Sequence, residues 1–254
     1  MSFARDTLLI FRRQLRLSLR NPAWVIIGLI QPLLYLALFG PLFAKVFDTG
    51  LIGGAHNAYG YFVPGLLIMM GLFGAAFVGF TIIADWRNGV IERFRVTPVS
   101  RLAILAGRVL RDVVTLLVQA LLLVLAGLAF GLRAPVTGVL IGFGFIAVVA
   151  VSLAALSYMT GLLTKSEDVL APALNMVTVP LMLLSGIMLP LVIGPGWLQA
   201  IARVSPFRYI INAMRAAYAG HYGGSIMIEG IGVAVGLAVL CLWLAGRTFM
   251  RENA

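Results

Sequence analysis

Charged residues are scarce in this sequence. Asp, Glu, Lys and Arg make up only 11% of its 254 residues, whereas soluble domains carry about 25%. Hydrophobic residues make up 61%. The longest stretches without any charged residue are 21–44, 49–84, 113–132, 134–164 and 169–202. This composition argues against a water-soluble protein and predicts an integral membrane protein.

Residues that react or bind metals are equally rare. The single cysteine, Cys241, excludes an internal disulfide and a cysteine metal cluster. The two histidines, His56 and His221, stand far apart and are interpreted as surface or packing residues. The sequence has no P-loop, no H-E-x-x-H zinc motif and no G-x-S-x-G nucleophile motif. We therefore expect no catalytic residue, no metal site and no cofactor bound by this chain.

The apolar runs predict an all-α membrane protein with six transmembrane helices in a single domain of residues 1–254. Three prolines at positions 172, 180 and 190 are expected to break the fifth span. The expected spans are 23–43, 61–84, 109–132, 136–163, 170–193 and 226–246.

Basic residues predict the orientation of these spans. With six spans, the inside segments hold fourteen of the nineteen Lys and Arg residues and the outside segments hold five. Because cytoplasmic loops are enriched in Lys and Arg, both termini are expected in the cytoplasm and the protein in the plasma (inner) membrane. The net charge of +10 could indicate nucleic acid as a partner. The cations flank apolar runs instead of forming a hydrophilic face, which favours membrane lipids as partners over nucleic acid.

The first 22 residues are expected to form an interfacial helix. Its two sides differ in chemistry, because one side carries leucine and phenylalanine and the other carries arginine. The apolar side holds Leu8, Phe11, Leu15 and Leu19, and the basic side holds Arg5, Arg12, Arg13, Arg16 and Arg20. The alternative is an ordinary cytoplasmic anchor that sets the orientation, and the two interpretations are compatible.

Residues 194–225 are too charged for a clean span and too apolar for a free loop. They carry Arg203, Arg208 and Arg215 within an otherwise apolar stretch. Two short helices that re-enter the outer leaflet, separated near Ser205-Pro206, fit this pattern best. Irregular backbone at such depth requires cover from protein or from a wet cavity.

The loop 85–108 between the second and third spans is the most charged segment between apolar runs. From Arg87 to Phe94 its pattern suits a short amphipathic helix, which Thr97-Pro98 would stop. Such a helix, tied to two spans, could transmit force from a cytoplasmic partner. The alternative is a solvated loop with ordinary topology-setting arginines.

Two blocks of sequence resemble the permease subunit of ABC-2-type ATP-binding-cassette exporters. The first runs from Arg87 to Arg101 and includes a Thr-Pro-x-Ser-Arg segment. The second begins at Leu184-Ser185-Gly186 and continues through Ser205-Pro206 to Met214-Arg215. The resemblance implies a homodimer or heterodimer of permeases bound to two separate ABC ATPase subunits, which would bind the ATP. It also implies a coupling helix between spans two and three.

The resemblance further implies roles for particular residues. Contact with the ATPase is assigned to Glu92, Arg93, Phe94 and Arg95. Thr97 and Pro98 are assigned to a rigid stretch of backbone where the chain leaves the coupling helix. A substrate path is assigned to the first and fifth spans. Its expected residues are Tyr35, Phe39, Met182, Ser185, Gly186 and Pro190. Because the spans lack a charged pocket, we expect hydrophobic or amphipathic cargo: drug-like compounds, lipids or lipid-linked glycans, as in antibiotic efflux.

Two other functions compete with this interpretation. An integral-membrane enzyme acting on lipids would need a polar cluster near one interface. The available residues are Arg203, Arg208, Arg215, His221 and Glu229, and they are dispersed in the sequence. A channel or secondary transporter is disfavoured because the expected spans carry few charged residues, of which Glu229 is the one considered as an ion site, and buried charges in spans usually mark ion relays.

Overall fold

The computed structural model describes residues 3–20, 23–48, 58–90, 100–187 and 195–251. These residues form helices joined by turns, and no strand occurs among them. The helices are α1 (Phe3–Arg20), α2 (Ala23–Asp48), α3 (Ala58–Ala76), α4 (Gly79–Arg87), α6 (Arg101–Ala129), α7 (Val136–Thr164), α8 (Glu167–Leu184), α9 (Gly196–Ala202), α10 (Pro206–Tyr218) and α11 (Ser225–Arg251).

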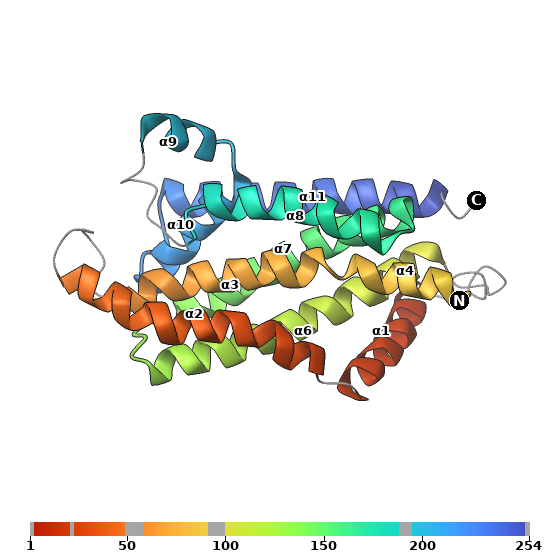
Figure 1. Cartoon of the computed structure of the whole chain (residues 1–254), viewed down its shortest axis with the longest axis horizontal. Helices are drawn as coiled ribbons and strands as arrows, with labels where there is room; N and C mark the ends of the chain where they lie inside the picture. Colours follow the sequence, from red (N-terminus) through yellow and green to blue (C-terminus); the bar gives the residue numbers. More distant parts are fainter. Residues whose placement is uncertain (1–2, 21–22, 49–57, 91–99, 188–194, 252–254) are drawn as a thin grey trace.

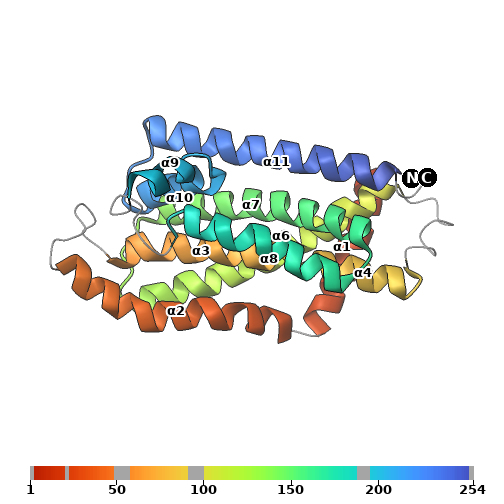
Figure 2. The same cartoon turned by 45° about the horizontal axis from the view of Figure 1, so that its top comes forward.

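The long helices run side by side in one elongated bundle (Figure 1). Both ends of the chain lie at the same end of this bundle, where α1 crosses the long axis steeply. The short helices α9 and α10 lie at the opposite end (Figure 2). We call these the terminal end and the far end of the bundle.

Six helical segments are long and apolar enough to cross a membrane, which confirms the expected number. They cover Val25–Leu42, Ala58–Arg87, Leu102–Ala129, Val136–Thr164, Glu167–Leu184 and Ser225–Met250. Many large apolar side chains on these helices point out of the chain. Leu38 on α2, Met176 on α8 and Val239 on α11 are each more than half exposed. So much exposed apolar surface needs lipid or another apolar protein surface to cover it.

Several expected boundaries need correction. The second span is two helices, because α3 ends at Ala76 and α4 begins at Gly79. The third span begins at Arg101, so the last eight residues assigned to the loop 85–108 are helical. Ser100 begins that helix, since its hydroxyl accepts a hydrogen bond from the amide of Ala103 at 3.2 Å. The hydropathy pattern missed these eight residues because two arginines, Arg101 and Arg108, stand at their ends.

The fifth span also differs from expectation. Helix α8 continues through Pro172 and Pro180 without a break and ends at Leu184. Each interior proline removes one amide donor, and a membrane helix tolerates this loss where neighbouring groups compensate. The end of α8 is instead set by Gly186, whose φ of 72° lies in the left-handed region that favours glycine. Pro190 lies outside the described residues.

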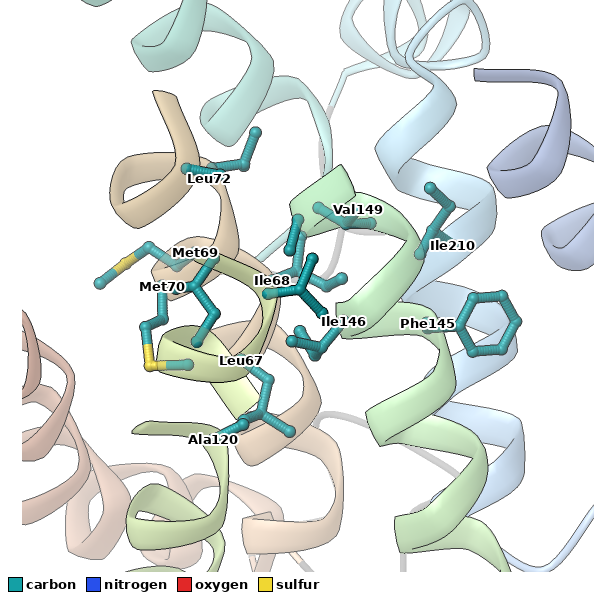
Figure 3. Close-up of a cluster of buried hydrophobic side chains, with 14 of the residues drawn as sticks. Leu67, Ile68, Met69, Met70, Leu72, Ala120, Phe145, Ile146, Val149 and Ile210 are labelled. Carbon is teal, nitrogen blue, oxygen red and sulfur yellow. The ribbon is translucent and has the colours of Figure 1, made fainter. Parts of the chain in front are cut away.

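Helices α3 and α7 form the centre of the bundle. The side chains of α3 between Phe62 and Leu72 are buried on nearly every side. Figure 3 shows part of this core. The labelled side chains are Leu67, Ile68, Met69, Met70 and Leu72 of α3, Ala120 of α6, Phe145, Ile146 and Val149 of α7, and Ile210 of α10. Because α3 has no face left for lipid, the other helices are arranged around it.

The N-terminal segment is helical as expected, and its packing adds a detail. Asp6 and Ile10 are buried, and Ile10 contacts α6 at Gly107. A side chain at Gly107 would meet the Ile10 side chain at 2.8 Å, so this close approach requires glycine. The apolar side chains Leu8 and Leu19 stay exposed, which leaves them available for lipid.

The far end contains two short helices, α9 and α10, and the expectation that they re-enter the outer leaflet stays a prediction. Ser205 precedes α10 and Pro206 occupies its first turn, so the chain divides where the sequence indicated. One side of α10 is buried against the bundle through Phe207, Ile210 and Met214. The opposite side carries polar and charged residues, which is why α10 is amphipathic.

Candidate functional site

The segment assigned to ATPase contact lies outside the described residues. Those residues are Glu92, Arg93, Phe94, Arg95, Thr97 and Pro98. The structure does describe both anchors of this segment, the end of α4 and the start of α6. The expected helix from Arg87 to Phe94 does not begin at Arg87, because α4 ends there and Asn88-Gly89 form a turn. Gly89 has a φ of 67°, which accounts for a glycine at this turn.

A buried ion pair joins the two anchors. The Arg108 guanidinium on α6 lies 2.6 Å from a carboxylate oxygen of Asp85 on α4. Arg108 is only 2% exposed, whereas the side chain of Asp85 is 28% exposed. A buried charge without its partner is costly, so this contact fixes α4 against α6. The Nε of Arg108 has no hydrogen-bond partner in the part of the chain that the structure describes.

A second contact extends from α6 to α7. The Asp112 carboxylate lies 3.1 Å from the Arg111 guanidinium and accepts a hydrogen bond of 2.5 Å from the Tyr158 hydroxyl. Both Asp112 and Tyr158 are buried. We call Asp85, Arg108, Arg111, Asp112 and Tyr158 the charged cluster. It connects α4, α6 and α7.

Sequence reasoning missed the charged cluster, because it treated the cations near Arg108 as loop charges. One signal was available. Arg108, Arg111 and Asp112 are spaced three and four residues apart, so on one helix they project from the same side. The spacing does not show that this side of the helix contacts Asp85 and Tyr158, because both residues lie on other helices.

The break between α3 and α4 is held by α7. The Ser157 hydroxyl donates a hydrogen bond to the carbonyl of Ala76 and accepts one of 2.8 Å from the amide of Gly79. One side chain therefore satisfies backbone groups on both sides of the break. Gly161 permits the close crossing, because a side chain there would meet the carbonyl oxygen of Gly79 at 2.7 Å.

An exposed ion pair adds a weaker link at the terminal end. Arg87 at the end of α4 lies 3.5 Å from Glu167 at the start of α8. Both side chains are well exposed, and such pairs contribute about 0–1 kcal/mol at most. This pair contributes little stability beside the buried contacts of the charged cluster.

The expected substrate-path residues fall into two groups. Tyr35 and Phe39 on α2 are partly buried, and their rings meet edge to face with centroids 5.6 Å apart. Met182 is partly buried on α8. Helix α2 packs on α3 and α6, whereas α8 packs chiefly on α3, α7 and α4. Within one chain the structure therefore does not bring the two groups together.

The end of α8 serves packing instead of presenting polar groups. The Ser185 hydroxyl donates to the carbonyl of Met182 at 2.7 Å, within its own helix. The carbonyl of Gly186 accepts a hydrogen bond of 2.9 Å from Arg215 on α10. Ser185 is buried, so its hydroxyl is not offered to cargo in this conformation.

Arg215 was expected as an outer cation and as a candidate polar residue for an enzyme, and in the structure it holds three segments together. Besides Gly186, its guanidinium donates to the carbonyl of Tyr61 on α3 at 3.2 Å. It also stacks over the Tyr61 ring at 3.6 Å from the centroid, a cation–π contact. Burial lowers the pKa of Arg215 to about 10, so the group remains charged at neutral pH. These contacts form a clamp that joins α10, α3 and the end of α8.

The polar residues considered for an enzyme partly converge. Arg203, Arg208 and Glu229 line one cavity of about 270 Å³ at the far end, so the sequence impression of dispersal was wrong for these three. Arg215 and His221 are not among its lining residues. The hydroxyl of Tyr209, which could serve as a nucleophile, donates its hydrogen bond to the backbone carbonyl of Arg203 instead of to a side-chain base.

Known proteins resemble this chain over most of its length. Residues 5–219 match the sequence profile of the ABC-2 type transporter family. The daunorubicin resistance ABC transporter permease protein DrrB1 of Streptomyces coeruleorubidus is 29% identical over 241 residues, covering 92% of this chain and 82% of the relative. The protein named "Putative transport permease ycf38" of Cyanophora paradoxa is 28% identical over 219 residues, covering 85% of this chain and 75% of the relative. A probable doxorubicin resistance ABC transporter permease protein, DrrC, of Mycobacterium tuberculosis is 25% identical over 248 residues, covering 94% and 85%.

Proposed function

This chain belongs to the ABC-2 type transporter family, and on that premise we propose that it is the membrane permease of an ATP-driven exporter. The observation that carries the proposal is the match over residues 5–219, which includes all the expected coupling residues. Separate ABC ATPase subunits bind and hydrolyse the ATP. This chain contributes the membrane path and the surface on which the ATPase acts.

We assign the ATPase contact to Glu92, Arg93, Phe94 and Arg95. Thr97 and Pro98 would make the backbone rigid where the chain leaves this contact. The charged cluster supports this assignment, because it ties both anchors of the segment to α7. Movement of the segment would pass to α4 and α6 through the Asp85–Arg108 pair. It would pass on to α7 through the bond between Asp112 and Tyr158. The helices would then shift as packed units, as in other gated proteins.

The break at Phe77 and Val78 gives α4 a place to pivot relative to α3. Helix ends and short irregular segments are where hinge motion is absorbed. Because Ser157 bonds to both sides of the break, α7 would control that pivot. The orientation that fits this mechanism places the terminal end in the cytoplasm of the plasma (inner) membrane. The arginine asymmetry of the sequence supports it.

We propose that two permease chains pair, either identical or from two genes. Helices α2 and α8 lie on different parts of the surface and expose much of their apolar surface. Tyr35, Phe39 and Met182 can face one path where α2 of one permease approaches α8 of another. Ser185, Gly186 and Pro190 would shape its outer mouth. The cargo is hydrophobic or amphipathic, and the drug-resistance names of two relatives favour drug-like compounds over lipids and lipid-linked glycans.

The test is co-purification of the intact chain with the ABC ATPase encoded beside its gene. We expect the two proteins to purify together, and drug accumulation in cells to fall when both are present. The double variant Glu92→Ala/Phe94→Ala should lose both properties because it removes a charge and a ring from the proposed contact. The matched control is Lys45→Ala/Phe130→Ala, which removes an exposed charge and an exposed ring that lie outside the proposed contact. Unchanged association and efflux in the first variant would reject the coupling role.

A further inference from the structure

A polar cavity lies at the far end of the bundle, where α9, α10 and α11 meet. Its volume is about 270 Å³, smaller than the roughly 300–1,000 Å³ typical of drug-sized sites. One water molecule takes up roughly 30 Å³ in the liquid. The cavity therefore has room for a small polar group such as a lipid headgroup. The lining residues are Arg203, Arg208, Tyr209, Asn212, Ile226 and Glu229.

The walls of this cavity are held in place by contacts among themselves. Arg208 donates a hydrogen bond of 3.1 Å to the carbonyl of Gln199 on α9. The Tyr209 hydroxyl donates to the carbonyl of Arg203 at 3.0 Å. On the other side, Gly230 of α11 packs directly against Ala213 of α10. These contacts fix the spacing of the three helices, so the cavity is a built feature of the fold.

The charged groups of the cavity are not paired with one another. Within the described part of the chain, the Arg203 guanidinium and the Glu229 carboxylate form no ion pair or hydrogen bond. Arg208 forms no ion pair there either, and its guanidinium donates a hydrogen bond to the backbone carbonyl of Gln199. Two cations and one anion therefore line a shared space, and none of the three forms an ion pair within the residues that the structure describes.

This charge pattern selects for a particular ligand chemistry. Two guanidinium groups suit a phosphate, because arginine donates two parallel hydrogen bonds to its oxygens. An ion that carries only negative charge would be repelled by the Glu229 carboxylate. An ion that carries only positive charge would be repelled by both arginines. A group that carries phosphate and a primary ammonium matches all three charges. The ammonium would donate hydrogen bonds to Glu229.

The rim of the cavity indicates that this group is attached to an apolar chain. Ile226 lines the cavity and is 52% exposed, and Val204, next to Arg203, is 83% exposed. Trp197 on α9 is also largely exposed, and tryptophan is enriched where membrane meets water. A soluble zwitterion would leave this apolar surface uncovered, whereas the acyl chains of a lipid would cover it.

We propose that this cavity binds the headgroup of a zwitterionic phospholipid, with the phosphate on Arg203 and Arg208 and the primary ammonium on Glu229. Phosphatidylethanolamine has this chemistry. The bound headgroup joins the charge of Arg203, just after α9, with charges on α10 and α11, and so gives the far end of the bundle a preference for one lipid class. Lipid binding at this site needs neither ATP nor an ATPase, so its test does not depend on the proposed permease role.

The experiment is native mass spectrometry of the full-length protein in detergent. The probes are dioleoyl phosphatidylethanolamine, phosphatidylcholine and phosphatidylglycerol. The wild type should retain phosphatidylethanolamine about tenfold better than the other two. Phosphatidylcholine has a quaternary ammonium that cannot donate hydrogen bonds, and phosphatidylglycerol has no ammonium. Equal retention of the three lipids would overturn the proposal.

Variants test which residue binds the phosphate of the headgroup and which binds its ammonium. Arg203→Gln should weaken retention of all three lipids about tenfold. Glu229→Gln should abolish the preference for phosphatidylethanolamine over phosphatidylglycerol, and Glu229→Lys should reverse it. Lys45→Gln, which removes an exposed cation from α2, is the control and should behave as wild type. Wild-type selectivity in both Glu229 variants would contradict the ammonium site.

A competition experiment distinguishes a lipid from a soluble source. Soluble O-phosphoethanolamine carries the same phosphate and ammonium but no acyl chains. If the apolar rim contributes as we propose, millimolar O-phosphoethanolamine should leave bound phosphatidylethanolamine in place. Displacement at concentrations equal to those of the lipid would overturn the assignment to a lipid and identify a site for soluble zwitterions.

Discussion

The Ser157 hydroxyl accepts a hydrogen bond of 2.8 Å from the backbone amide of Gly79, across the crossing of α7 and α4. The same hydroxyl donates to the carbonyl of Ala76, so it bridges the break in the second span. In a bilayer core no water replaces a missing backbone partner, and each unsatisfied group is costly. The break is therefore stable only where α7 supplies this serine.

The single cysteine offers a direct measure of unfolding for the variants below. Cys241 on α11 is 3% exposed and is the only cysteine in the sequence. A fluorogenic maleimide should react with it slowly in the folded protein and rapidly after unfolding. The temperature at which labelling accelerates then reports the stability of each variant in detergent.

Gly79→Ala should lower this unfolding temperature. The new Cβ would meet the backbone carbonyl oxygen of Ser157, which cannot move aside as a flexible side chain could. Overpacking of this kind costs about 1–3 kcal/mol. Gly144→Ala on α7 is the control, because its Cβ would meet open space and alanine favours helix. Equal unfolding temperatures for the two variants would show that the crossing is not as close as described.

The Asp85–Arg108 pair should respond unequally to removal of its two members. Asp85→Ala leaves the buried Arg108 charge without a partner, a loss of about 3–5 kcal/mol for buried pairs. Arg108→Met leaves Asp85, which is 28% exposed and can reach water, so its cost should be smaller. The double variant should be more stable than Asp85→Ala alone, because no unpaired charge remains. A double variant that is less stable than both single variants would contradict this account.

Arg215→Lys should destabilise the far end although it keeps the charge. A lysine ammonium cannot bond to the carbonyls of Tyr61 and Gly186 and also stack flat on the Tyr61 ring. Loss of these contacts should cost about 1–3 kcal/mol, measured by Cys241 labelling. Lys45→Gln is the comparison, since that side chain is exposed on α2 and its loss should change stability by less than about 0.5 kcal/mol. Similar effects in the two variants would argue against a clamp.

Labelling of new cysteines should establish the orientation in the membrane. In a Cys241→Ser background, Gly223→Cys at the far end should react with a membrane-impermeant maleimide in intact cells. Asn88→Cys at the terminal end should react only after the cells are permeabilised. Both positions are exposed in the fold, so access depends on the side of the membrane. The reverse pattern would place both termini outside and contradict the arginine asymmetry.

Parts of the fold were predictable because their signals are local. The number of spans follows from apolar length, and the separation of α9 from α10 follows from Ser205 and Pro206. The continuity of α8 through Pro172 and Pro180 was not predictable, because it depends on how neighbouring groups compensate for a lost amide. The six coupling residues assigned from the resemblance lie outside the described residues and remain predictions.

The sequence alone determined that this chain crosses a membrane with six apolar helices, because hydropathy and length depend only on neighbours along the chain. The tertiary structure alone decided which charges are buried and with what partner. Asp85 pairs with Arg108 across two helices, and Asp112 bonds to Tyr158, 46 positions away. Hydropathy assigns a cost to each charge but does not identify its partner, because the partner is chosen by helix packing.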